Sequence, residues 1–321
     1  MTGCKILITG GSGFIGTNLI DFYSKDNKVL NLDISEPRNK EHMEFWVKVN
    51  INDYHELDRA ISEFSPDIVI HMAARTDLDG KSLDDYSSNI GGVQNILEIT
   101  NKVDSITKVI FASSRLVCEI GYTPKDEFDY RTTTIYGESK VIGEKLVREF
   151  SDYTKKWIIV RPTSIWGPWF DVPYKTFFTT IKNKRYFHPK NISIYKHFGY
   201  VKNSVYIIDK LIDKDKFNGK SIYLSDFTAL EVNSWANMIS NQFHRKGIRE
   251  IPLVFLTLVA VAGDCLKYLG YTNPPLTSFR LNNLLTEMIY DIKDVECEIG
   301  DLPFSLETGV VETVNWMIEN D

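Results

Sequence analysis

The chain has 321 residues, of which 43% are apolar and 25% are charged. This balance is typical of a globular protein with a sizeable core and argues against a fibrous or disordered chain. The formal net charge of -6 argues against nucleic acid as an obligatory partner, because phosphate backbones favour basic surfaces. Four widely spaced cysteines predict reduced thiols in a cytoplasmic protein, not a zinc site or a disulfide framework. They are Cys4, Cys118, Cys265 and Cys297.

The N-terminus runs directly into an apolar stretch, without a basic leader or a cleavage signal. The longest apolar run, 251–262, is too short to cross a bilayer. We therefore expect neither export nor a membrane span.

Short apolar runs alternate with helix-length stretches as far as Pro162. This alternation is typical of successive βαβ units and predicts an α/β fold with a doubly wound parallel sheet. After Pro162 the chain becomes rich in Trp, Phe, Tyr and Pro, and later segments mix short strands with helices. We expect one domain at 1–165 with a return segment at about 200–225, and a smaller α/β substrate-binding domain at about 166–199 and 226–321. The expected strands of the sheet are 5–8, 29–32, 68–70, 109–111 and 157–160.

A glycine-rich turn, TGGSGFIG, follows the first expected strand. Gly11, Gly13 and Gly16 match the fingerprint of a Rossmann-type dinucleotide-binding domain, in which glycines allow a tight turn and a close approach of pyrophosphate. The helix that follows offers free N–H groups to phosphate. Glycine-rich turns also occur for structural reasons, so the motif is weak evidence alone. The predicted cofactor-binding residues here are Gly10, Gly13, Phe14, Ile15 and Gly16.

The second expected strand ends in Asp33, 20 residues after Gly13. At this spacing a carboxylate accepts hydrogen bonds from the ribose hydroxyls of a bound dinucleotide. The same carboxylate repels a 2′-phosphate, so NAD is favoured over NADP as the cofactor. Arg38 lies close enough in sequence to soften that preference.

Tyr136 and Lys140 are four residues apart in IYGESK, which places them on one face of a helix. A free phenol, with a pKa of about 10, is protonated at neutral pH. A neighbouring ammonium group and an oxidised nicotinamide ring would lower that pKa and make Tyr136 usable as an acid and base. A surface helix can carry the same pair without any such role.

Taken together, the motifs resemble those of the extended short-chain dehydrogenase/reductase family, in particular its NAD-dependent epimerase/dehydratase group, which modifies nucleotide sugars. The resemblance covers nearly the whole chain. The motifs that carry it are TGGSGFIG at 9–16, Asp33, HMAA at 71–74, NIGGVQN at 89–95, FASSRLV at 111–117, YGESK at 136–140, RPTSIWGP at 161–168 and PFSLETGVVETVNWM at 303–317.

The resemblance implies that Tyr136 is the acid/base, that Lys140 holds the nicotinamide ribose and that Ser114 hydrogen-bonds the reacting sugar oxygen. It places Asn89 on the cofactor side, although helix capping or packing suits Asn89 equally well. No metal ion is implied. The further implied residues are Asn50, Ile51, Met72, Ala73, Ala74 and Pro162 for the cofactor, and Thr76, Ser114, Ser164 and Arg280 for the substrate, with Arg280 as the diphosphate arginine.

Departures from the family pattern narrow the reaction. Arg115 follows Ser114 where the dehydratases and decarboxylases carry Asp or Glu, so a dehydratase is disfavoured. Ser164 stands where the family often has Asn, which leaves the glycosyl group open. Cys118 fits a packed free thiol better than a nucleophile, because no His is adjacent.

These observations predict an NAD-dependent nucleotide-sugar epimerase that inverts C4 of a UDP-hexose through a transient 4-keto sugar. An NAD(P)H-dependent reductase of 4-keto nucleotide sugars is the alternative, and a non-catalytic dinucleotide sensor is a third interpretation. The expected partners are a nucleotide-diphosphate sugar and, by the resemblance, a second copy of the chain in a homodimer. Cytoplasmic polysaccharide biosynthesis is the expected setting.

Overall fold

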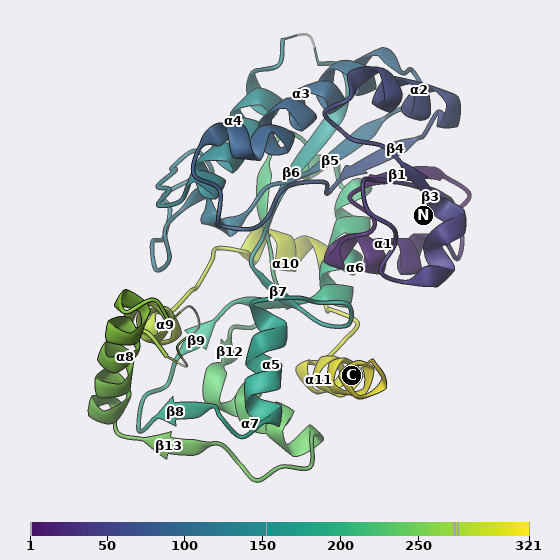
Figure 1. Cartoon of the computed structure of the whole chain (residues 1–321). Coiled ribbons are helices and arrows are strands. Elements are labelled where there is room, and N and C mark those ends of the chain that lie inside the picture. Colours follow the sequence, from purple (N-terminus) through teal and green to yellow (C-terminus); the bar gives the residue numbers. More distant parts are fainter. Residues whose placement is uncertain (1, 152, 272–273, 275, 321) are drawn as a thin grey trace.

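The computed structural model describes residues 2–151, 153–271, 274 and 276–320. Seven parallel strands form its central sheet, in the order β11-β6-β5-β4-β1-β2-β3 (Figure 1). The order reverses between β1 and β4, and such a switch point opens a crevice at the carboxyl ends of the strands. The predicted fold class is confirmed. The strands are β1 (Lys5–Thr9), β2 (Lys28–Asp33), β3 (Trp46–Lys48), β4 (Ile68–His71), β5 (Lys108–Ala112), β6 (Lys156–Pro162) and β11 (Ser221–Leu224).

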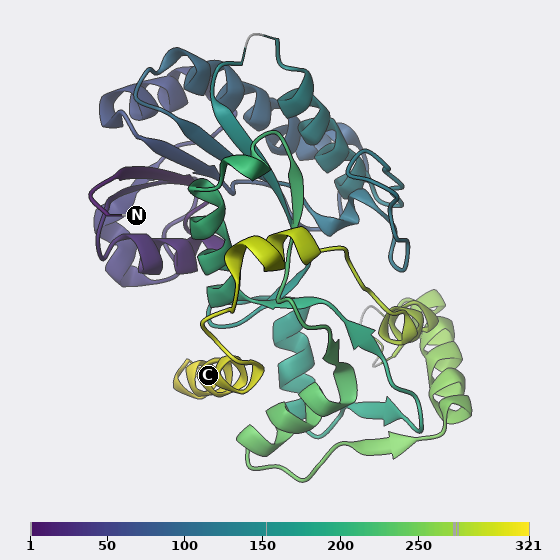
Figure 2. The same ribbon diagram turned by 180° about the vertical axis from the view of Figure 1, so that it is seen from behind.

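Helices cover both faces of this sheet (Figures 1 and 2). Because side chains alternate along a strand, Ile6 and Ile8 of β1 join one apolar core and Leu7 joins the other. Both faces are therefore buried, which explains the continuous apolar runs in the sequence. The first core is shared with α1 (Phe14–Tyr23), α6 (Val201–Ile212) and α10 (Lys293–Ile299), and the second with α2 (Tyr54–Phe64), α3 (Ser87–Lys102) and α4 (Ile135–Glu149).

Much of the rest of the chain packs around a separate aromatic core below the carboxyl ends of the strands (Figure 1). Trp166 and Trp235 are almost fully buried at its centre, with ring centroids 5.2 Å apart. Most aromatic side chains of 166–187 therefore serve packing. The strands here are β7 (Ser164–Trp166), β8 (Phe187–Pro189), β9 (Tyr195–Lys196), β10 (Phe198–Tyr200), β12 (Leu230–Glu231) and β13 (Arg249–Ile251). The helices are α5 (Tyr174–Lys182), α7 (Val232–Gln242), α8 (Leu253–Tyr268), α9 (Ser278–Leu285) and α11 (Leu306–Glu319).

The three short sheets of this second part each pair two strands: β10 with β7, β12 with β9, and β13 with β8. The expected division of the chain into two domains stays a prediction, and below we refer to the sheet part and the aromatic part.

Candidate active site

A cavity of about 810 Å³ opens at the carboxyl ends of β1, β2, β4, β5 and β6. Its far wall comes from residues 171–174, at the start of α5 in the aromatic part. The cavity thus lies where a doubly wound sheet places its ligand. The predicted site residues that line it are Gly10, Gly13, Phe14, Ile15, Gly16, Asp33, Asn50, Ile51, Met72, Ala73, Ala74, Thr76, Ser114, Tyr136, Lys140 and Pro162.

The glycine loop turns tightly between β1 and α1. Gly10 has a φ of +72°, and a Cβ there would lie 2.5 Å from the backbone nitrogen of Ala73 on the neighbouring strand end. A Cβ on Gly16 would overlap the carbonyl oxygen of Gly10, so the helix packs directly on the loop. Gly13 is the N-cap of α1 and supplies no side-chain cap, which leaves first-turn N–H groups for an anion. The loop therefore fits a pyrophosphate.

Asp33 sits beside this loop at the end of β2. Its Oδ2 accepts a hydrogen bond from the Ser12 amide (3.1 Å), and its Oδ1 accepts one from the Ser35 amide (2.9 Å). Burial raises the pKa of Asp33, whereas these amides and the Arg38 charge lower it. The carboxylate is held rigidly at the cavity wall, as a ribose acceptor requires.

The predicted catalytic residues meet at the ends of β5 and α4. Ser114 directly precedes a short 3-10 turn after β5, and its Oγ accepts a hydrogen bond from the Leu116 amide (3.1 Å). Tyr136 and Lys140 project from the first two turns of α4, which Thr134 caps. Lys140 Nζ donates to the Ala112 carbonyl oxygen (3.0 Å). All three side chains line the one cavity that also holds Asp33.

The groups that shift the pKa of Tyr136 differ from the expectation that the Lys140 ammonium lowers it. Burial raises the pKa of its phenol, while a hydrogen bond with Ser114 and the positive charge of Arg115 lower it. Lys140 is fully enclosed, and burial lowers its pKa to about 8, with Glu144 acting in the opposite direction. Arg115 therefore adds a positive charge that acts on the phenol of Tyr136. A bound dinucleotide would add the charge of its nicotinamide ring.

Arg115 also faces the aromatic part. Burial raises the pKa of the phenols of Tyr174 and Tyr290, and the positive charge of Arg115 lowers both. Of these three residues, Tyr174 lines the cavity, and its hydroxyl is a polar group on the cavity wall.

A buried ion pair lies next to the predicted catalytic residues Lys140 and Ser114. The Arg161 guanidinium donates to both Glu144 carboxylate oxygens, at 2.8 and 2.7 Å, and both side chains are about 1% exposed. Ser113 Oγ and the Tyr130 hydroxyl donate to the same carboxylate, at 2.6 and 2.9 Å. Glu144 lies one helical turn after Lys140, and Ser113 adjoins Ser114. This network was not predicted, because its members are far apart in sequence.

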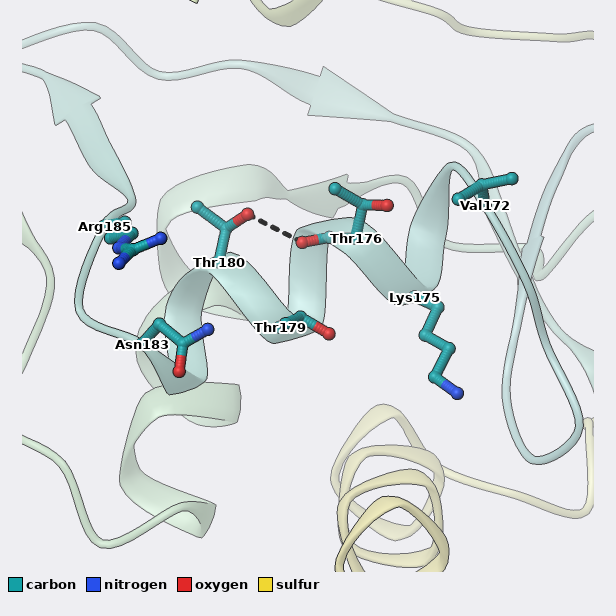
Figure 3. A pocket seen from close by; sticks show the side chains of 7 residues that line it. All are labelled: Val172, Lys175, Thr176, Thr179, Thr180, Asn183 and Arg185. Atoms are coloured by element: carbon teal, nitrogen blue, oxygen red, sulfur yellow. Dashed lines mark hydrogen bonds between the residues drawn. The ribbon is translucent and has the colours of Figure 1, made fainter. Parts of the chain in front are cut away.

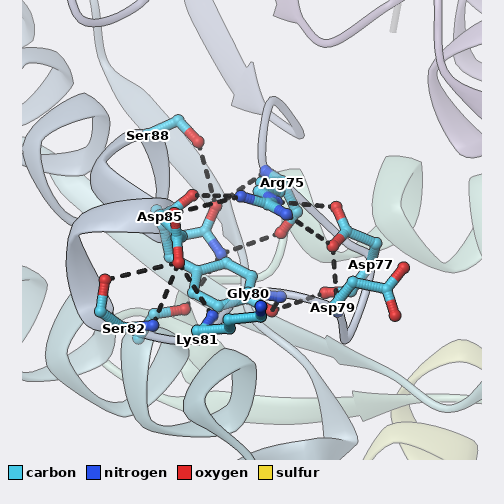
Figure 4. Close-up of polar contacts among 11 residues, drawn as sticks. Arg75, Asp77, Asp79, Gly80, Lys81, Ser82, Asp85 and Ser88 are labelled. Carbon is cyan, nitrogen blue, oxygen red and sulfur yellow. Dashed lines mark hydrogen bonds and ion pairs between the residues drawn. The ribbon is translucent and has the colours of Figure 1, made fainter.

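Residues 72–76, at the start of the loop between β4 and α3, line the cavity. Figure 4 shows the polar contacts that hold this loop together. Arg75 pairs with Asp77 at 2.8 Å and approaches Asp85. The buried Asn89 amide accepts from the Arg75 amide (2.8 Å) and donates to Ser139 Oγ (3.0 Å). Asn89 does not line the cavity, so its position favours the packing role.

Two predicted substrate residues lie away from the cavity wall. Ser164 is buried on β7, behind the lining residues Thr163 and Ile165. Arg280 is on the exposed first turn of α9, and its Nη1 donates to the Pro274 carbonyl oxygen (2.8 Å). Their substrate roles stay predictions. Cys118 is buried, and its thiol donates to the Asp129 carbonyl oxygen, so it is a packed thiol.

Sequence reasoning missed the far wall of the cavity. Asp171 and Tyr174 line it, and Arg38 reaches across to donate to the Trp169 carbonyl oxygen (2.9 Å) and to pair with Asp171 (3.5 Å). No local signal relates residue 38 to residue 171. The aromatic composition after Pro162 was the one available hint.

A second hollow, about 300 Å³, lies along α5 (Figure 3). Its lining includes none of the predicted catalytic residues. Among the described residues, no group of three His, Cys, Asp or Glu could hold a metal ion. Within the same residues, no helix has both the length and the apolar character to cross a bilayer.

Fold and site together define a Rossmann-type protein with a serine–tyrosine–lysine set in its cavity. The family model "NAD dependent epimerase/dehydratase family" matches residues 6–223, so the chain belongs to that family. The chain is an enzyme by this membership, as its relatives are.

Individual relatives agree over the full length. The N-acetyl-alpha-D-glucosaminyl-diphospho-ditrans,octacis-undecaprenol 4-epimerase of Escherichia coli O157:H7 is 23% identical over 97% of this chain and 95% of its own. The structure of UDP-N-acetylglucosamine 4-epimerase from Methanobrevibacter ruminantium M1 matches with a TM-score of 0.76, 21% identity and full coverage of both chains. The UDP-glucuronic acid 4-epimerase of Bacillus cereus, in complex with UDP-glucuronic acid and NAD, matches with a TM-score of 0.76 and 18% identity over 99% of this chain and 100% of its own.

Proposed function

We propose that the chain is an NAD-dependent 4-epimerase of a nucleotide-linked sugar, with a UDP-hexose as the expected substrate. The observation that carries this proposal is the shared cavity, in which Ser114, Tyr136 and Lys140 stand beside the glycine loop and Asp33. The loop, the uncapped start of α1 and the Asp33 carboxylate fit a dinucleotide with a free ribose 2′-hydroxyl, which favours NAD.

Bound NAD supplies a hydride acceptor and donor at the sugar carbon. Tyr136 removes the proton of the C4 hydroxyl. After the 4-keto sugar has rotated and presents its other face to the cofactor, Tyr136 returns a proton to the same oxygen. Ser114 hydrogen-bonds the same sugar oxygen and keeps it next to the phenol. Lys140, oriented by the Ala112 carbonyl, holds the ribose and adds positive charge near the phenolate.

The group to which the substrate sugar is linked has to be tested, because the relatives are named for sugars on different groups. The two solved relatives are named for UDP-sugars, whereas the Escherichia coli relative is named for a sugar diphosphate linked to undecaprenol. We favour a UDP-sugar, and a polyprenyl diphosphate sugar belongs in the same substrate panel. A homodimer and a place in polysaccharide biosynthesis also stay predictions.

The test is to release and identify the nucleotide that co-purifies with the protein, and then to assay a panel of UDP-hexoses without added cofactor. Bound NAD and interconversion of C4 epimers support the proposal. Stoichiometric consumption of NADH or NADPH by a 4-keto nucleotide sugar, without epimerisation, would identify the reductase instead. Dinucleotide binding with no turnover of any sugar would leave the sensor hypothesis.

A further inference from the structure

Helix α8 carries an apolar surface that the described part of the chain leaves uncovered. Leu256 and Ala260 pack against α9, and Gly263 brings the helix close to the backbone of Leu276. The other sides of the helix are exposed. The exposed apolar residues are Val254 (69%), Phe255 (58%), Leu258 (62%), Val259 (48%), Val261 (51%) and Leu266 (44%), followed by Tyr268 (92%), Leu269 (78%), Tyr271 (58%) and, on α9, Phe279 (69%).

The geometry of the helix sharpens this contrast. With about 3.6 residues per turn, Val254, Leu258 and Val261 fall opposite to the packed residues. The two charged residues of α8, Asp264 and Lys267, fall on the flank nearer to α9. The outward face is therefore apolar along its length. A helix that is apolar on nearly all sides belongs in a protein core or in lipid, and a continuous exposed patch of this kind marks an interaction site.

The length of α8 excludes a transmembrane role for this helix. Sixteen residues span about 24 Å, which is less than the roughly 30 Å of the hydrocarbon core of a bilayer. Such a helix can lie parallel to the membrane, with its apolar face among the headgroups and the first methylene groups. Tyr268 and Tyr271, exposed at its carboxyl end, are residues that favour this interface.

The charge around α8 indicates whether its apolar face binds a second copy of the chain or a lipid surface. Segment 245–280 holds five basic and two acidic residues, a net charge of +3, whereas the whole chain has a net charge of -6. A symmetric contact between two copies through this face would bring a positive segment against itself. An anionic lipid surface instead attracts it, and each basic residue near such a surface adds affinity. Figures 1 and 2 show α8 at an outer corner of the aromatic part, free to approach a flat surface.

We propose that α8 and the exposed residues Leu269 and Tyr271 that follow it form a membrane-docking surface that lies flat on an anionic lipid bilayer. Phe255, Leu258 and Tyr268 enter the headgroup region, and the basic residues of segment 245–280 contact lipid phosphates. The inference stands on this surface and its charge, and does not depend on the proposed reaction.

Co-sedimentation of the full chain with extruded vesicles tests the proposal. The wild-type protein should bind vesicles of equal parts phosphatidylglycerol and phosphatidylcholine, less so in high salt, and weakly to phosphatidylcholine alone. F255E/L258E should lower the bound fraction about tenfold or more. V311E/I318E places the same charges on two exposed apolar positions of α11 and should bind like the wild type. Matching circular dichroism shows that each variant is folded.

A second variant guards against misfolding of the first. K246Q/R249Q removes two exposed charges from the loop and strand before α8, and should weaken binding to the anionic vesicles but not to the neutral ones. No binding of the wild type to anionic vesicles would overturn the proposal, and so would equal binding of F255E/L258E. Conversion of a wild-type oligomer to monomers by F255E/L258E, measured by light scattering without lipid, would also overturn it, since α8 would then join two copies.

Discussion

The sheet part and the aromatic part bury their side chains in different ways. Around the cavity, the sheet part encloses polar groups in paired networks, such as Glu144 with Arg161 and Asn89 with Ser139. The aromatic part encloses closely packed aromatic rings and leaves one apolar helix, α8, exposed. Chemistry needs polar groups fixed to within fractions of an ångström, which a regular sheet with buried hydrogen bonds provides. Recognition surfaces tolerate more variation, because apolar contacts are not directional.

A single substitution can remove a central ring of the aromatic part. Trp235 is 1% exposed and lies 5.0 Å from the Phe177 ring and 5.2 Å from the Trp166 ring. Trp235→Ala should lower the free energy of unfolding by about 4 kcal/mol, because it opens a large cavity. Urea denaturation measures the change. Ile318→Ala, at an exposed position of α11, is the control and should have little effect. A loss below about 1 kcal/mol for Trp235→Ala would show that the rings contribute little to stability.

A single substitution can also disrupt the buried ion pair of the sheet part. Glu144→Gln leaves the Arg161 guanidinium in the interior without its counter-charge, which should cost about 3 kcal/mol of unfolding free energy. The exposed pair between Glu36 and Lys40 offers a matched control, since Lys40→Gln should not change stability measurably. Equal effects of the two substitutions in urea denaturation would show that the Glu144 network stabilises the fold no more than a surface ion pair does.

The third test concerns the chemistry of the cavity. Tyr136→Phe should retain NAD but lower turnover at least about a hundredfold, because the acid/base group is lost while the ring still packs. Tyr153→Phe removes another buried hydroxyl, which is 2.7 Å from Thr100 Oγ1 and outside the cavity, and should leave turnover unchanged. Steady-state kinetics and titration with NAD separate the two effects. Unchanged turnover in Tyr136→Phe would remove this phenol from the mechanism.

The last test concerns the pH dependence of stability that Lys140 causes. Burial lowers the pKa of Lys140 to about 8 in the folded protein, below the value of about 10.5 expected when unfolded. Below pH 8 the enclosed ammonium therefore lowers stability, and this penalty is relieved as the pH rises from about 8 to about 10.5. Lys140→Met should be more stable than the cofactor-free wild type at pH 7, with a difference that shrinks toward pH 10. A constant difference across denaturation curves would contradict this.

The sequence allowed prediction of those parts of the site whose chemistry is local. The glycine loop, Asp33 and the pair Tyr136 and Lys140 each lie within a short motif next to a strand or helix end, so regular geometry brings them together. The placement of Ser114 followed from the family resemblance and from the end of β5. The fold class followed from the alternation of apolar runs and helical stretches.

The features that could not be predicted depend on contacts between segments that are far apart in the sequence. No periodicity relates Arg38 to Asp171, or Glu144 to Arg161, since each pair joins different elements. The length of the apolar run 251–262 excludes a membrane span, but its composition gives hydrophobicity and not exposure, so the open face of α8 could not be predicted. Arg280 was singled out for its charge, and the structure places it on α9, away from the cavity lining.

The bridge from Arg38 to Asp171 and the Trp169 carbonyl oxygen joins the end of the sheet to the opposite wall. An adenosine bound by Asp33 would lie beside this bridge. We therefore expect the bridge to open before a bound dinucleotide is exchanged for another. Because the Arg38–Asp171 pair is partly exposed, dissolved ions weaken it. If the proposed function holds, the residence time of the cofactor should then shorten as ionic strength rises.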